Sequence, residues 1–141
     1  MIRIGIIGTG FGAKVHIPGF QAIKGARVLG IASSDPKKTA QIAKENNIKL
    51  AFKNWQDLVS SPEIYAVSIT TPPHMHFKMA MAALKIGKHV LCEKPLAMNL
   101  QEAEQIKKQV ETSGKVFMLG HQYLYNDDVA ALKHELDQGR I

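Results

Sequence analysis

The stretch IRIGIIGTGFGA, residues 2–13, decides the fold of this 141-residue chain. Its first six residues are mostly apolar and show no polar alternation, which is typical of a strand buried on both faces. The glycines that follow break the strand, and an amphipathic pattern then continues to about residue 24. A strand, a glycine turn and a helix in this order are the context in which a G-x-G-x-x-A sequence indicates a dinucleotide-binding site.

Each small residue of this fingerprint has an expected task. Gly8 permits a tight turn, Gly10 lets the backbone approach a pyrophosphate, and Ala13 lets the helix pack closely on the strand. Phe11 and Gly12 complete the loop, and the start of the helix offers N–H donors and a positive dipole to an anion. We therefore predict that the loop binds a dinucleotide. The alternative is a glycine turn with a structural role only.

Apolar strands and amphipathic helices alternate along the rest of the chain, without a repeat or a linker. We expect strands at residues 2–7, 27–32, 50–52, 66–71, 89–92 and 116–119. The expected helices end near residues 24, 47, 59, 86, 112 and 138. Strands separated by helices predict a parallel sheet covered on both faces, which is a doubly wound α/β fold in a single three-layer domain. Ligands of such sheets bind beyond the carboxyl ends of the strands, so functional residues are expected there.

The composition is that of a globular protein, with 45% hydrophobic and 21% charged residues. The longest apolar runs fall far short of the roughly 20 residues that a membrane span needs, and no signal peptide is apparent. The single cysteine, Cys92, cannot form an internal disulfide. This favours a reducing compartment, and we expect a cytoplasmic location with no membrane partner.

The formal net charge of +6 raises nucleic acid as a candidate partner. Residues 1–94 hold 13 lysines and arginines against 5 acidic residues, whereas residues 95–141 hold 5 against 7. The cations are dispersed lysines with only three arginines, so the pattern does not favour nucleic-acid binding. A phosphate-bearing small ligand suits the basic part of the chain better.

The end of the second expected strand bears on the choice of cofactor. An acidic side chain there would accept from the ribose 2′-hydroxyl of NAD, whereas small hydroxyls and nearby cations would accommodate the 2′-phosphate of NADP. The residues present are Ser33 and Ser34, and the following Asp35 precedes a proline, which favours helix capping. With Lys37 and Lys38 close by, we predict a preference for NADP over NAD. The alternative is that both lysines are only solvated.

The fourth expected strand leads into TTPPHMH, residues 70–76. Its two histidines, His74 and His76, are two positions apart at a helix start and do not face one metal ion, so no metal site is expected. Each histidine either lines the cofactor groove or only caps or packs.

Polar residues also follow the fifth and sixth expected strands. Lys94 could exchange a proton with an oxygen undergoing oxidation or carbonyl reduction, and Glu93 could orient Lys94 by a charge-assisted contact. The alternative is a solvated ion pair at the end of a strand. Gln122, within GHQY at residues 120–123, converges on the same edge of the sheet.

The N-terminal half of the Gfo/Idh/MocA oxidoreductases, a family named for glucose-fructose oxidoreductase and inositol dehydrogenase, closely resembles this chain. The similarity covers essentially all 141 residues and is carried by GTGFGA with His16 soon after, TPPHMH, AALKIGKHVLCEKPLAMNLQEAE and GHQY. The resemblance implies a Rossmann domain that binds NAD or NADP. It also implies reversible hydride transfer between the nicotinamide and a carbinol or carbonyl carbon, often in a sugar, inositol or related polyol.

The resemblance also implies roles for individual residues. Lys94 would lie beside the nicotinamide and help with protonation or alignment, with Glu93 at the cofactor. Thr71, Pro72 and His76 match the family's Thr-Pro-x-x-x-His element and would line the nicotinamide end.

The chain departs from the family pattern in two respects. Leu124 stands where an arginine is common, and Asp127 and Asp128 replace a usual proline, which affects substrate-side and interdomain contacts. Family members also continue into a second α/β domain, which supplies the substrate pocket and the oligomer interface. We therefore expect a cofactor-binding domain at residues 1–126 and a terminal helix at residues 127–141 that leads to the missing domain.

Two functions follow from these expectations. The first is an NAD(P)-dependent oxidoreductase represented by its cofactor-binding domain, which takes a sugar or polyol substrate only together with the second domain. The family's full-length members are expected to be homo-oligomers. The alternative function is a non-catalytic dinucleotide sensor or regulatory protein.

Overall fold

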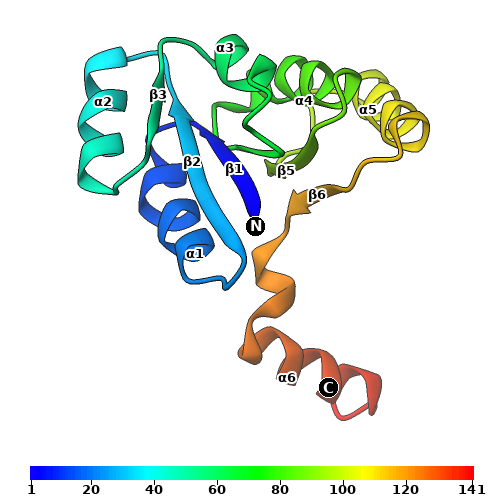
Figure 1. Ribbon diagram of the computed structural model, residues 1–141. Helices are drawn as coiled ribbons and strands as arrows, with labels where there is room; N and C mark the ends of the chain where they lie inside the picture. Colours follow the sequence, from blue (N-terminus) through cyan, green and yellow to red (C-terminus); the bar gives the residue numbers. More distant parts are fainter.

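The computed structural model describes all residues from 1 to 141. Its six strands form one parallel sheet in the order β3-β2-β1-β4-β5-β6 (Figure 1). The strands are β1 (Ile2–Ile7), β2 (Ala26–Ala32), β3 (Leu50–Phe52), β4 (Ala66–Ile69), β5 (His89–Glu93) and β6 (Phe117–Gly120). The chain order switches direction between β1 and β4, which is where doubly wound sheets bind their ligands. The predicted fold class is confirmed.

Helices cover the sheet from two sides. Ile6 and Ile7 are neighbours in β1 and belong to two different buried cores, because successive side chains of a strand point to opposite faces. One core lies under α1 (Ile17–Gln21) and α2 (Pro36–Glu45). The other core lies under α3 (Trp55–Ser60), α4 (His76–Lys85) and α5 (Leu100–Ser113).

Short helical turns join the strands to the main helices. These turns are η1 (Gly12–His16), which is a π-helical turn, and the 3-10 turns η2 (Pro73–Met75) and η3 (Gln122–Tyr125). β4 ends at Ile69 and not at residue 71 as expected. The two prolines after Thr71 explain the difference, because proline has no N–H for a sheet and restricts the residue before it. The Thr70 N–H still donates to the Ile7 carbonyl of β1 at 2.9 Å, and the chain leaves the carboxyl edge of the sheet from Thr71 onward.

The last helix, α6 (Asp127–Asp137), extends away from the sheet, and none of its residues is buried (Figure 1). None of the helices combines the length and the apolar character that crossing a bilayer would require.

Candidate functional site

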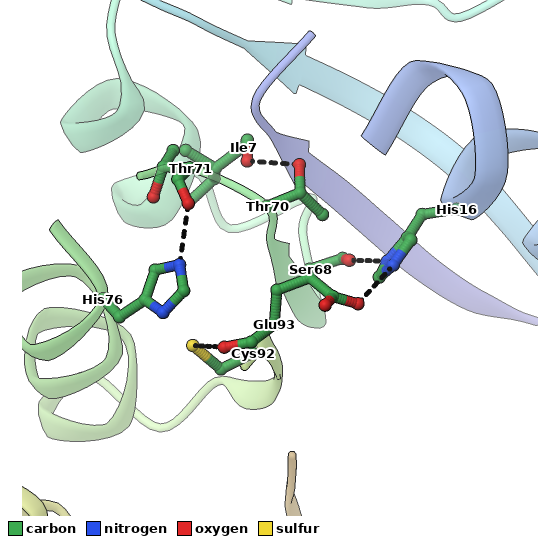
Figure 2. Close-up of polar contacts among 8 residues, drawn as sticks. All are labelled: Ile7, His16, Ser68, Thr70, Thr71, His76, Cys92 and Glu93. Carbon is green, nitrogen blue, oxygen red and sulfur yellow. Dashed lines mark hydrogen bonds and ion pairs between the residues drawn. The ribbon is translucent and has the colours of Figure 1, made fainter. Parts of the chain in front are cut away.

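The fingerprint loop packs closely against Thr70, which follows the last residue of β4. A side chain at Gly8, whose φ is +119°, would place its Cβ 2.5 Å from the Thr70 hydroxyl oxygen, and a Cβ at Gly12 would also meet that oxygen. The Thr70 hydroxyl donates to the Ile7 carbonyl at 3.0 Å, which fixes its position (Figure 2). A Cβ at Gly10 would meet nothing within 4 Å. Two glycines thus permit close packing of the loop, and Gly10 leaves open space for a ligand.

Beside this loop lies a hollow of about 670 Å³, called here the first hollow. Predicted site residues that line it are Gly8, Gly10, Ser33, Ser34, Thr71 and Pro72. Lys53, Asn54, Trp55 and His74 also line it, and no aspartate or glutamate does. The three residues after β3 were missed from the sequence, although the same rule about the carboxyl ends of strands applies to them.

The residues after β2 are held by the start of α2. The Asp35 carboxylate accepts hydrogen bonds from the backbone N–H groups of Lys37 and Lys38, both at 3.0 Å, so the predicted capping role of Asp35 is confirmed. The Ser33 hydroxyl lies 2.7 Å from that of Thr39. Lys38 contributes to the cap through its backbone and does not line the hollow, so its role as a cofactor contact stays a prediction.

A second hollow of about 390 Å³ adjoins the first, because Thr70 and Thr71 line both. The other residues that line this second hollow are Phe11, Glu93, Lys94, Gln122 and Tyr123. The ends of β1, β4, β5 and β6 therefore bring five predicted site residues together around one space. Gly12 and Ala13 lie under the loop and line neither hollow.

Glu93 does not contact Lys94 as predicted. Its carboxylate lies instead 3.1 Å from Nε2 of His16, and Glu93 is only 9% exposed (Figure 2). Glu93 is the last residue of β5, and its carboxylate is taken up by the imidazole of His16, whereas Lys94 follows the strand. Lys94 is exposed, and its amine is free of that ion pair.

His76, which is predicted to line the nicotinamide end, is 1% exposed and lines neither hollow. Its ring nitrogens lie 2.7 Å from the Pro95 carbonyl oxygen and 2.8 Å from the Thr71 carbonyl oxygen. Carbonyl oxygens can only accept, so the imidazole is the donor in these contacts. His76 therefore connects the loop after β4 to the loop after β5. Figure 2 shows its contact with Thr71.

Comparisons with known proteins agree with this arrangement. The family model described as "Oxidoreductase family, NAD-binding Rossmann fold", of the Gfo/Idh/MocA type, matches residues 2–121. The 1,5-anhydro-D-fructose reductase of Ensifer adhaerens is 32% identical over 141 residues, which are 100% of this chain and 42% of the reductase.

Two solved structures have the same fold over nearly the whole chain. Scyllo-inositol dehydrogenase from Lactobacillus casei, with bound NAD(H) and scyllo-inositol, matches with a TM-score of 0.90 and 29% identity over 100% of this chain and 42% of that one. Biliverdin reductase from Synechocystis sp. PCC 6803, in complex with biliverdin and NADP⁺, matches with a TM-score of 0.88 and 29% identity. The match covers 96% of this chain and 43% of the reductase. The chain thus spans about two-fifths of the length of these proteins.

Proposed function

Because this chain belongs to the Gfo/Idh/MocA oxidoreductase family, we propose that it binds NADP, in preference to NAD, along its two adjoining hollows. We further propose that it serves hydride transfer between the nicotinamide and a carbinol or carbonyl carbon of a sugar, inositol or similar polyol. The observation that carries the proposal is the pair of adjoining hollows, which extend from the fingerprint loop to Lys94 and share Thr70 and Thr71. The relatives described above are a dehydrogenase and reductases, so they favour an oxidoreductase over a sensor.

The two hollows suggest how the dinucleotide would lie. The adenosine would occupy the first hollow beside Ser33 and Ser34, and the pyrophosphate would cross the open backbone at Gly10. The nicotinamide would lie in the second hollow between Thr71 and Lys94. Gln122 would then contact its far side.

We assign the exchange of the proton to Lys94, which lines the second hollow and is exposed. When bound, the nicotinamide supplies or accepts the hydride. In the direction of reduction, the Lys94 ammonium gives a proton to the carbonyl oxygen while the carbonyl carbon receives the hydride. In the direction of oxidation, the neutral Lys94 amine takes the hydroxyl proton as the hydride leaves the carbinol carbon, so atoms and charge balance in both directions.

The preference for NADP rests on the charges around the first hollow. No carboxylate lines it, and the nearby Asp35 is occupied by capping α2. Lys53 is the lysine that lines it, and its ammonium would pair with a 2′-phosphate. The related structures hold either NAD(H) or NADP⁺, so the choice depends on this chain's own residues.

Titration of the purified chain with NADPH and NADH, followed by nicotinamide fluorescence, tests the proposal. We expect NADPH to bind more tightly, and Lys53→Met to weaken NADPH by roughly 10- to 100-fold, as for a lost charge-assisted hydrogen bond. Lys37→Met is the matched control, because Lys37 does not line the hollow. We expect Ser33→Asp to shift the preference toward NADH.

Two outcomes would contradict this proposal at different levels. Tighter binding of NADH than of NADPH would show that the cofactor preference is wrong. Binding of neither dinucleotide below millimolar concentration would overturn the proposed function as a whole.

A further inference from the structure

A chain of three buried polar side chains lies beneath the second hollow and connects three elements of the fold. His16 of η1 lies 2.7 Å from the Ser68 hydroxyl of β4 through Nδ1 and 3.1 Å from the Glu93 carboxylate of β5 through Nε2. Ser68 is completely buried, and the side chains of His16 and Glu93 are 8% and 11% exposed. The rings of Phe11 and Phe20 contact the imidazole in T-shaped arrangements, with ring centroids 5.4 and 6.2 Å away. We refer to Ser68, His16 and Glu93 as the His16 chain.

The donors and acceptors of the His16 chain have one consistent arrangement for a neutral imidazole. A carboxylate can only accept, so Nε2 carries the hydrogen and donates it to Glu93. Nδ1 is then an acceptor, and the Ser68 hydroxyl donates to it. The hydrogen bonds thus run in one direction, from Ser68 to Glu93, and they fix the orientation of the ring.

The Glu93 carboxylate also packs closely against Gly120, where only a glycine leaves room for it. A Cβ at Gly120 would lie 2.7 Å from the same carboxylate oxygen that accepts from His16, and 3.1 Å from the carboxylate carbon. Glu93 lines the second hollow and also a smaller hollow of about 190 Å³ over β5 and β6. The carboxylate is therefore clamped at the wall of the space proposed for the nicotinamide.

His16 reaches β4 and β5 because of where it lies in the chain. It is the last residue of the π-helical turn that starts at Gly12, within the fingerprint. Wide π turns often occur at functional sites, where they redirect a side chain. The turn next to the proposed pyrophosphate position and the carboxylate beside the proposed nicotinamide position are thus joined by one side chain.

We propose that His16 is a positioning residue for the nicotinamide end of the site, acting through Glu93 and supported by Ser68. This inference rests on the proposed function, because it assigns a task toward the same dinucleotide. A clamped carboxylate presents a fixed acceptor to an N–H donor of the ligand, such as the carboxamide of nicotinamide. A carboxylate that has lost its imidazole partner does not keep this geometry.

The test compares a ligand that contains nicotinamide with one that lacks it. NADPH is titrated by fluorescence, and 2′-phospho-ADP-ribose, which has the same adenosine and pyrophosphate groups, is titrated by calorimetry. We expect His16→Phe to weaken NADPH by roughly 10-fold or more, as for a lost hydrogen bond to a charged group, and to leave 2′-phospho-ADP-ribose within about twofold. We expect His16→Gln, which keeps an N–H donor and an acceptor, to recover most of the NADPH affinity.

A double variant tests whether His16 acts through Glu93. Glu93→Gln alone should weaken NADPH, and adding His16→Phe to it should cause little further loss, because the partner of His16 is already altered. His134→Phe is the control for a histidine change on the surface, since His134 is exposed on α6. Unchanged binding of 2′-phospho-ADP-ribose also reports that each variant is folded.

The results that would overturn the proposal are distinct. Equal weakening of both ligands by His16→Phe would assign His16 a general structural role, and unchanged NADPH binding would assign it no role in binding. Additive losses in the double variant would show that His16 does not act through Glu93. If the unaltered chain bound neither ligand, the proposed function would fail first, and the role of His16 with it.

Discussion

Cys92 lies near the end of β5 with no exposed surface, one residue before Glu93. Burial, together with the charge of Glu93, raises the pKa of the Cys92 thiol to about 12. The thiol is therefore neutral near pH 7 and cannot act as a nucleophile, despite its position close to the groove. Cys92 is a core residue of the sheet.

This raised pKa predicts a specific dependence of stability on pH. The folded chain holds the thiol proton more tightly than the unfolded chain, whose ordinary value is 9.0. The stabilisation that the neutral Cys92 thiol contributes to the folded chain is thus complete below about pH 9, and it is lost as the pH rises toward 12. We expect the free energy of unfolding of the unaltered chain, relative to Cys92→Ala, to be roughly 1 kcal/mol lower at pH 10 than at pH 8.

Urea unfolding of both proteins at the two pH values measures this difference, and the Cys92→Ala protein cancels the titration of all other groups. A difference that does not change with pH would contradict the raised pKa. Thiol reagents should likewise react with Cys92 at pH 8 only when the chain unfolds.

At the level of elements, α4 is tied to the two strand ends on either side of the proposed nicotinamide position. Its first residue, His76, holds the Thr71 carbonyl after β4 and the Pro95 carbonyl after β5. His76 and His16 lie on opposite sides of β4 and β5 (Figure 2). The two imidazoles therefore support the proposed nicotinamide position from opposite faces of the sheet.

We predict that His76→Phe lowers the free energy of unfolding by roughly 1–3 kcal/mol, because it removes the hydrogen-bond partner of two partly buried carbonyl groups. His74→Phe, two residues earlier and exposed, should change this free energy by less than about 0.5 kcal/mol. Chemical denaturation monitored by far-UV circular dichroism checks both values. Equal effects of the two substitutions would contradict the bridging role of His76.

For the whole molecule, the outline of the fold could be predicted from the sequence, because it follows from local patterns. The apolar run of β1, the glycine fingerprint and the Asp35 cap each depend on neighbouring residues. The main errors concern contacts between distant positions. His16 meets Glu93, 77 positions later, and His76 meets Pro95, and no periodicity indicates such pairs. Lys53 is different, since it directly follows a predicted strand and could have been found.

The placement of the two cores predicts how much of the chain is needed for stability. All core residues lie between Ile4 and Ile106, whereas α6 has no buried residue and exposes Val129, Leu132 and Leu136. We expect a polypeptide of residues 1–126 to have a Tm within about 3 °C of the 141-residue chain. Ile106→Ala in α5 provides the comparison, because the loss of this buried side chain should lower the free energy of unfolding by about 2–5 kcal/mol.

Differential scanning calorimetry of the shortened and the complete polypeptides checks the expectation for α6. A Tm lowered by much more than this would mean that α6 stabilises the sheet, and the boundary at residue 126 would then be wrong.

The separate core under α1 and α2 also affects the order in which the chain folds. Its eight buried residues all lie between Ile4 and Ile48. The residues that pair β1 with β2, such as Ile2 and Ala26, are closer in the sequence than those that pair β1 with β4, such as Ile4 and Ala66. Contacts between near positions form sooner, since their loops cost less entropy to close. During synthesis, the first three strands can therefore assemble before β4 emerges. Until β4 pairs with it, β1 keeps one edge without a hydrogen-bonded neighbour. In this interval the nascent chain is most open to association with another chain.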